Sequence, residues 1–195
     1  MSDVRRRILE ASAELVAERG GRAVSFREVA RRAGISHQTP YHHFGNHHGI
    51  LRALAVEGFE GLSAAMEAAA DGLDALGAAG VAYVRFARDH VGHTRVMFDR
   101  ALVTLFAAED PVVEAARTYD VLMGLALRAH LHGYGADFDP ATLAHLCWST
   151  VHGLAVLMVE GILERKSTGV DEDTMAGDVI QALTTLFRSR AASSR

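Results

Sequence analysis

The chain has 195 residues, enough for one domain or two small ones. Its hydrophobic content of 49% allows a sizeable core and argues against disorder. The formal net charge is −4, and the single cysteine, Cys147, excludes an internal disulfide and fits a reducing compartment.

The sequence carries no sign of export or of membrane insertion. It has no run of 18 uncharged apolar residues, so no segment is predicted to span a membrane. The N-terminus, MSDVRRRILEASAEL, has arginines but no apolar region followed by a cleavage site, so it is not predicted to be a signal peptide. We therefore expect a soluble cytoplasmic protein with no membrane partner.

Charge is distributed unevenly along the chain. Residues 1–52 hold nine arginines against five acidic residues, a net charge of +4, while residues 53–195 carry −8. Five of the 11 histidines lie between His37 and His48, within the basic part. A small basic unit on an acidic body favours contact with a polyanion at one end, although chance clustering gives the same asymmetry.

Helical signals recur along the whole sequence, and no convincing strand is found. Apolar residues at helical spacing, together with capping residues, predict the boundaries. The expected helices span about residues 3–18, 25–33, 36–44, 46–70, 73–90, 94–106, 111–132, 140–165 and 171–188. The predicted fold class is all-α, with about nine helices.

Several caps support these boundaries. Ser25 with Glu28 three residues later is a capping-box pattern, and Gly34 ends the same helix. Asn46 can cap the fourth helix, and Asp139 precedes a proline in the first helical position. Ser36 is the expected cap of a short third helix.

Three short helices with a glycine-containing turn between the second and third form a helix-turn-helix unit. In such units the later helix lies in the major groove of DNA. Tyr41 and Phe44 are three apart and are expected to anchor this helix to its own core. The side chains expected to point outward are His37, Gln38, Thr39 and His42. Glutamine can pair with adenine through two hydrogen bonds, and threonine can contact a base or the thymine methyl.

Pro40 limits the third helix. With Ser36 as the cap, Pro40 stands fourth and forfeits a hydrogen bond to the Ser36 carbonyl, so a helix of about two turns is expected. A proline-terminated loop is the alternative.

Residues 5–52 resemble the DNA-binding domain of the TetR family of transcriptional regulators. The motifs are ILEAS, ERG, the Ser-x-x-Glu start, Ala-Gly-Ile-Ser and Thr-x-Tyr-x-x-Phe. WSTVHG at 148–153, with the segments AYVRFARDH and RVMF, resembles the regulatory domain of a TetR subfamily named for a Trp-His-Gly signature.

The resemblance implies a homodimer that places two recognition helices on a pseudo-palindromic operator. It implies a DNA-binding domain over 1–46 and a helical effector-binding and dimerisation domain over 47–195. The predicted DNA-binding residues are Ser25, Arg27, Ser36, His37, Gln38, Thr39, Tyr41, His42 and His47. His47 stands where the family often has a phosphate-contacting lysine, and Pro40 replaces an aliphatic residue. Because histidine changes charge near neutral pH, we expect operator affinity to rise as pH falls from about 8 to 6.

The larger domain offers candidate effector contacts. His145, Trp148 and His152 share one helical face, which could line a cavity, pack against a dimer partner or belong to the core. Further apolar lining candidates are Tyr83, Phe86, Phe98, Phe106 and Met123, for each of which ordinary core packing is the alternative.

Metal binding and catalysis are not expected. The paired histidines at 42–43 and 47–48 have no cysteine or carboxylate close by in the sequence. No nucleophile elbow and no phosphate-binding glycine loop occurs, so neither an enzyme nor a cofactor is predicted. Cys147 has apolar neighbours and is interpreted as an inert buried thiol.

These observations predict a dimeric transcriptional regulator, a repressor that binds double-stranded operator DNA and a small, mainly apolar effector. The helices at about 140–165 and 171–188 are the dimer candidates, because their apolar stripes can pair with a second copy in a four-helix bundle. The competing hypothesis is a helical ligand carrier or an enzyme whose N-terminal helices do not bind DNA.

Overall fold

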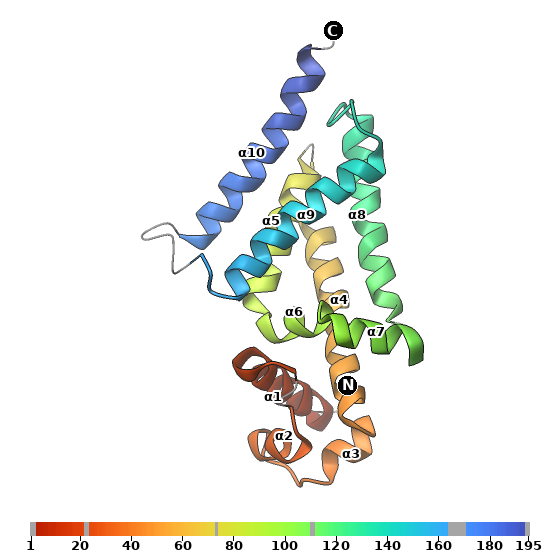
Figure 1. Cartoon of the computed structure of the whole chain (residues 1–195), viewed down its shortest axis with the longest axis vertical. Coiled ribbons are helices and arrows are strands. Elements are labelled where there is room, and N and C mark those ends of the chain that lie inside the picture. Colours follow the sequence, from red (N-terminus) through yellow and green to blue (C-terminus); the bar gives the residue numbers. More distant parts are fainter. Residues whose placement is uncertain (1–2, 22–23, 73, 110–111, 164–170, 194–195) are drawn as a thin grey trace. The chain divides into compact units, whose positions relative to one another are not determined.

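The computed structural model describes residues 3–21, 24–72, 74–109, 112–163 and 171–193. In this part the chain forms ten α-helices and no strand, which confirms the predicted all-α fold (Figure 1). The helices are α1 (Asp3–Arg19), α2 (Phe26–Ala33), α3 (Thr39–Phe44), α4 (His47–Ala69), α5 (Ala75–Asp89), α6 (Val91–Met97), α7 (Arg100–Glu109), α8 (Val113–Leu131), α9 (Pro140–Val159) and α10 (Glu172–Ser193).

The tenth helix arises because one predicted helix is two. The segment expected to be continuous over 94–106 is broken between α6 and α7. Phe98 ends α6 with non-helical backbone angles, and the carboxylate of Asp99 accepts hydrogen bonds from the backbone N–H groups of Ala101 (2.8 Å) and Leu102 (3.1 Å). An aspartate that caps a new helix in this way ends the previous one.

The helices pack as two compact units. The first contains residues 1–60 and 90–115, and the second contains residues 61–89 and 116–195. The chain passes between the units three times: within α4, between α5 and α6, and just after the start of α8. This grouping reflects packing, so the division at residues 46 and 47 remains a prediction about function.

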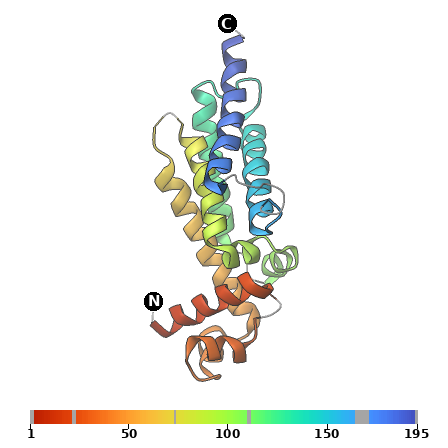
Figure 2. The same ribbon diagram turned by 90° about the vertical axis from the view of Figure 1, so that its left-hand side faces the viewer.

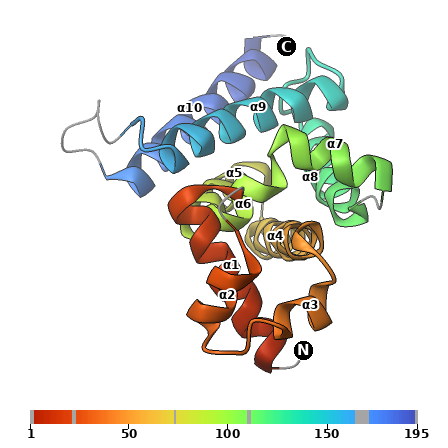
Figure 3. The same cartoon turned by 60° about the horizontal axis from the view of Figure 1, so that its bottom comes forward.

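The first unit is built on an apolar core that α1, α2 and the first half of α4 share with α6 and α7. Figure 3 shows α1, α2 and α3 grouped beside α4, which is seen nearly end-on. The fully enclosed side chains of this core are Ile8, Leu9, Leu15, Val16, Val29, Ile50, Leu51, Leu54 and Val96. Most of them lie at helical spacing in α1 and α4, so the predicted apolar stripes face this core.

Close backbone contact holds α6 against α1. A Cβ atom at Gly92 would lie 2.1 Å from the carbonyl oxygen of Ala13, so only glycine allows this approach. The guanidinium of Arg95 donates to the carbonyl oxygen of Ala17 at 2.6 Å. That carbonyl belongs to the last turn of α1, where backbone acceptors have no partner within the helix. α6 is therefore an integral part of the unit that contains α1 and α2.

The second unit contains α5, α9 and α10, which lie side by side (Figure 2). Val151 and Ile180 approach Gly80 of α5, where a Cβ would be 3.3 Å and 3.5 Å from them. A buried hydrogen bond of 2.7 Å joins the hydroxyls of Ser63 and Thr118, on α4 and α8. Helix-to-helix contacts of this kind are those of a helical bundle.

α9 is long and apolar enough to cross a membrane by length and composition alone. Seven of its side chains are buried in the second unit: Leu143, Ala144, Cys147, Val151, Leu154, Ala155 and Met158. α9 packs against both α5 and α10, which is the position of a core helix in a bundle. It ends at Val159, before the predicted end at 165, and residues 164–170 lie outside the described part.

Candidate nucleic-acid interface and effector cluster

The turn between α2 and α3 is set by caps at both ends. Ser25 caps α2 as predicted by accepting a hydrogen bond from the Glu28 backbone N–H at 3.3 Å. The Glu28 carboxylate, the other half of the expected capping box, binds Arg31 instead. Gly34 closes α2 in the left-handed conformation (φ 64°), which a residue with a side chain rarely adopts. The Ile35 N–H then donates to the Ala30 carbonyl at 3.0 Å. This geometry fixes where the chain enters α3.

α3 begins later than its sequence indicated. Gln38, rather than Ser36, is the N-cap residue, and it makes no side-chain capping bond. Pro40 is therefore the second residue of α3, where its missing N–H costs no helical hydrogen bond. The prediction that Pro40 stands fourth and forfeits a bond was wrong, as was the alternative of a loop. The expected short helix is confirmed, with six residues.

The anchor of α3 also differs from the prediction. Pro40 is the buried residue, whereas Tyr41 is 52% exposed. The Tyr41 ring meets the ring of Phe26 edge-on, with 4.2 Å between centroids. Phe44 packs against the core as expected, and the guanidinium of Arg5 lies 5.0 Å from its centroid. Tyr41 thus packs on one side and presents its other side to solvent.

The structure leaves most predicted DNA-binding side chains exposed on one short segment. Ser25, Arg27, Ser36, His37, Gln38, Tyr41 and His42 are exposed, while Thr39 and His47 are partly buried. Two side-chain contacts order the turn: Ser36 Oγ lies 3.0 Å from Thr39 Oγ1, and Gln38 Nε2 lies 3.4 Å from His37 Nε2. Polar side chains held outward at the start of a recognition helix can reach base edges.

α4 starts as predicted. The side-chain oxygen of Asn46 accepts a hydrogen bond from the Gly49 N–H at 2.9 Å. His47 is the first residue of α4, and its Nε2 lies 3.2 Å from the carbonyl oxygen of Gly21. His47 therefore links the start of α4 to the segment that follows α1.

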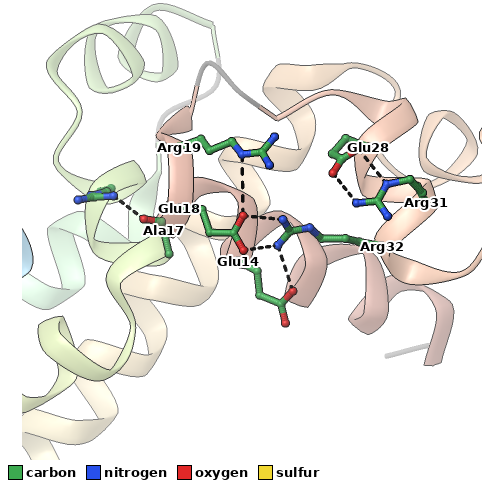
Figure 4. Close-up of polar contacts among 8 residues, drawn as sticks. Glu14, Ala17, Glu18, Arg19, Glu28, Arg31 and Arg32 are labelled. Atoms are coloured by element: carbon green, nitrogen blue, oxygen red, sulfur yellow. Dashed lines mark hydrogen bonds and ion pairs between the residues drawn. The ribbon is translucent and has the colours of Figure 1, made fainter.

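Arginines near the turn are engaged by carboxylates of the same unit (Figure 4). Arg32 binds both oxygens of Glu18, one at 2.8 Å, and contacts Glu14 at 3.4 Å. The hydrogen bond from Arg32 lowers the pKa of the Glu18 carboxyl. Arg31 binds Glu28 at 2.7 Å and likewise lowers the pKa of that carboxyl. Exposed pairs of this kind add little stability, but they offset much of the arginine charge.

A polar aromatic cluster joins α5 to α9 in the second unit. The Tyr83 hydroxyl lies 2.9 Å from Nδ1 of His152, and the Trp148 ring lies 6.2 Å from the His152 ring. Burial raises the pKa of the Tyr83 hydroxyl and lowers the pKa of the His152 imidazole, which keeps both neutral near pH 7.

α8 extends this cluster through a residue that the sequence did not reveal. The Tyr119 hydroxyl lies 3.2 Å from Nε2 of His145, and the Tyr119 ring lies 6.2 Å from Trp148. The structure thus brings together Tyr83, His145, Trp148 and His152. Tyr119 was missed because its register on α8 relative to α9 depends on tertiary packing.

The other predicted effector residues take different positions. Phe86 is buried against Gly61, where a Cβ would lie 2.8 Å from its ring, and Met123 is partly buried on α8. Phe98 and Phe106 belong to the first unit: Phe98 packs edge-on against Phe59, and Phe106 is part of the core.

Cys147 is buried on α9, and burial raises the pKa of its thiol to about 11. It is therefore protonated near neutral pH, in line with an inert thiol. Among the residues that the structure describes, no three histidine, cysteine or acidic side chains gather as a metal site would require.

Apolar residues occupy part of the exposed face of α9, which also carries His145 and Ser149. Opposite its buried residues lie Leu146, Gly153 and Leu157, and a Cβ at Gly153 would meet no described atom within 4 Å. α10 adds the exposed side chains of Val179 and Leu186, the latter 65% exposed. An uncovered apolar surface on two long helices is typical of a contact with another chain.

Comparison with known proteins agrees with this arrangement. Residues 8–54 match the bacterial regulatory proteins of the tetR family, and residues 76–183 match the tetracyclin repressor-like C-terminal domain. No curated protein is similar enough to match the chain.

Solved structures share the fold over nearly the whole chain. A protein of unknown function from Rhodococcus sp. RHA1 is 29% identical, with a TM-score of 0.72 over 96% of this chain and 94% of its own. The TetR family transcriptional regulator PfmR from Thermus thermophilus is 23% identical (TM-score 0.70; 92% and 97% covered). The regulator FadR from Bacillus subtilis, in complex with stearoyl-CoA, is 17% identical (TM-score 0.67; 92% and 97%).

The two matches fall on the exposed helix-turn-helix and on the helical bundle, and the C-terminal match alone covers more than half of the chain. The chain therefore belongs to the tetR family of bacterial regulatory proteins, as a DNA-binding transcriptional regulator.

Proposed function

We propose that the protein is a dimeric repressor whose operator binding changes when a small, mainly apolar effector binds the second unit. The observation that carries the DNA-binding part is the exposed set at the start of α3, with Gln38 and His42 exposed and the anchor Pro40 buried. Base contacts come from Gln38 and Thr39, and Ser25, Arg27 and Ser36 contact the backbone. DNA as the partner implies a cytoplasmic protein.

Replacing Gln38 or Thr39 with alanine should relax sequence preference. Each good contact to a base is worth about 1–3 kcal/mol of discrimination, about 5- to 150-fold in affinity between operator and unrelated duplex. Fluorescence anisotropy with the protein's own upstream DNA and with an unrelated duplex measures this ratio.

Arg27→Ala is the matched control for those two variants. Because this variant removes a phosphate contact, it should weaken binding to both duplexes by the same factor. The slope of log affinity against log salt concentration should also fall by about one. If Gln38→Ala and Thr39→Ala also weaken binding to both duplexes equally, then α3 makes no sequence-specific contact with the bases. A chain that binds no duplex at low salt would instead be a ligand carrier or an enzyme.

We propose dimerisation through α9 and α10. Gly153 lies on the exposed side of α9 between the exposed side chains of Leu146 and Leu157, and a Cβ there would meet no described atom within 4 Å. A second α9 could therefore approach closely at this position. A four-helix bundle of two α9 and two α10 helices would bury this surface.

The effector is proposed to contact the cluster of Tyr83, Trp148 and His152, in keeping with the resemblance to the subfamily named for Trp-His-Gly. Neutral hydrogen-bonding groups among aromatic rings suit an uncharged polar group on an apolar body. Stearoyl-CoA, which FadR binds, joins a long apolar acyl chain through a thioester to a charged nucleotide carrier; its acyl chain and thioester carbonyl support an apolar body with one uncharged polar group here.

Trp148 is the single tryptophan of the chain, so its emission reports on the cluster. Titration with long-chain acyl-CoA should change this emission saturably and shift operator affinity by about 5- to 150-fold. Tyr83→Phe, which keeps the ring but removes the hydroxyl, should weaken the fluorescence response. A ligand that changes the emission but leaves operator affinity constant contradicts the switch.

A further inference from the structure

The polar aromatic cluster of the second unit runs from the surface of the bundle into its interior. His145, Trp148 and His152 are spaced by three and four residues on α9, so they lie in a row along one face. Tyr119 of α8 lies 3.2 Å from Nε2 of His145 at one end of this row, and Tyr83 of α5 lies beside His152 at the other. His145 is exposed, whereas Tyr83 is only 4% exposed. The pair of Tyr119 and His145 is therefore the outer end of the cluster.

The helix that supplies Tyr119, α8, is packed less tightly than α5. Four of its 19 residues are buried, compared with seven of the 15 residues of α5. The backbones of α5 and α9 approach each other closely, and no described helix approaches the backbone of α8 in this way. α8 is therefore held to its neighbours mainly by side chains, and a helix with few buried apolar contacts opens locally at a low free energy.

Two neighbouring residues of α8 form hydrogen bonds in different surroundings. The hydroxyl of Thr118 lies 2.7 Å from the hydroxyl of Ser63 on α4, and both side chains are buried. The next residue, Tyr119, meets His145 where water has access. Breaking the buried pair leaves polar groups unsatisfied, whereas Tyr119 and His145 can bond to water once they separate. Movement of α8 away from α9 should therefore begin at Tyr119, with Thr118 kept in place.

We infer that the effector reaches Trp148 between α8 and α9, and that the hydrogen bond between Tyr119 and His145 closes this entrance. The inference rests on the proposed effector binding at the cluster and adds Tyr119 and His145 as positioning residues. The Tyr119 ring lies 6.2 Å from the Trp148 ring, so its displacement uncovers the indole. Because the bond closes the entrance both before and after the effector has entered, its loss should speed entry and exit equally and leave the affinity unchanged.

Hydrogen exchange of the full-length protein tests the closing bond without an effector. In the wild type, the backbone N–H groups of α8 should exchange faster than those of α5. Tyr119→Phe keeps the ring but removes the hydroxyl, so exchange in α8 should rise about 2- to 10-fold, the effect of one net hydrogen bond on an opening equilibrium. Exchange in α5 should stay as in the wild type.

Access to the indole is measured with two probes, and the single tryptophan of the chain makes the assignment direct. Acrylamide, a small neutral quencher, should quench Trp148 more strongly in Tyr119→Phe than in the wild type. Stearoyl-CoA is the second probe, followed by stopped-flow emission. The association and dissociation rate constants of this variant should rise by the same factor, with an unchanged Kd.

Tyr83→Phe is the matched comparison, because it removes the same atom at the inner end of the cluster. Tyr83 is a proposed effector contact, so its variant should raise the dissociation rate constant alone and weaken the affinity. Exchange in α8 should be that of the wild type, since Tyr83 bonds to α9 and not to α8.

Either unchanged exchange in α8 or unchanged acrylamide quenching in Tyr119→Phe overturns the inference. So does a Tyr119→Phe protein whose affinity for stearoyl-CoA falls as it does in Tyr83→Phe, because Tyr119 would then be an effector contact. Wild-type emission that does not respond to stearoyl-CoA is a different result. It would contradict the proposed class of effector, while the exchange and acrylamide measurements would still decide whether the entrance exists.

Discussion

Replacing Gly153 with leucine is expected to convert the dimer into a monomer and to lower operator affinity by about 100-fold or more. A Cβ at Gly153 meets no described atom of its own chain within 4 Å, so the leucine should fit the folded monomer. The same side chain would hold two α9 helices apart at their closest approach. The monomer then binds one half-site through a single recognition helix and loses the affinity that simultaneous binding of a second half-site adds. Light scattering gives the mass, and anisotropy gives the affinity.

Gly124→Leu provides the control. Gly124 lies on α8 and is equally open, but it is outside the proposed interface on α9 and α10. This variant should remain a dimer with unchanged operator affinity. A Gly153→Leu protein that still has the mass of a dimer would place the interface on another surface.

Gly92→Ala is expected to destabilise the first unit by about 2–3 kcal/mol. The added methyl would lie 2.1 Å from the Ala13 carbonyl oxygen, so α6 and α1 must separate. Their separation would also disturb the hydrogen bond from Arg95 to Ala17. Because α1 packs on α2, operator affinity should fall as well. Urea unfolding measures the change in the free energy of unfolding, provided that the dependence of this free energy on urea concentration is the same in both proteins.

The same substitution at Gly124 should have the opposite sign. With open space around it, alanine there raises the free energy of unfolding by about 0.5–1 kcal/mol, because it disfavours the unfolded chain and favours the helix. Equal effects at both positions would show that contact between α6 and α1 does not limit stability.

Local signals in the sequence predicted several helix ends. Ser25 and Asn46 form the expected caps, because an N-cap acts within three residues and needs no tertiary information. Gly34 ends α2 for the same reason. Asp139 caps α9 through the N–H groups of Ala141 and Thr142, again as expected.

Errors arose where two local signals competed. Ser36 and Gln38 both precede α3, and burial of Pro40 selected the later start. Asp99 is a good cap, but the apolar residues on both sides of it continued a helical stripe and concealed the break. At α3 burial of Pro40 decided which signal prevailed, and between α6 and α7 the side-chain cap of Asp99 did.

The effector cluster could be predicted only within one helix. His145, Trp148 and His152 share a face of α9 by their spacing. Tyr83 was a separate candidate on aromatic character alone, and its hydrogen bond to His152 spans 69 residues. Tyr119 contacts His145 from α8 and had no signal of its own. Contacts between helices depend on their register, which the periodicity of one helix does not contain.

The most direct test of the account is a footprint of the full-length protein on the DNA upstream of its own coding sequence. Two recognition helices carried by one dimer should protect a pseudo-palindrome whose half-sites are centred one helical turn, about 34 Å, or a multiple apart. Protection of this kind should disappear for Gln38→Ala combined with Thr39→Ala. Absence of any protected site at low ionic strength, with the protein folded, would contradict the account.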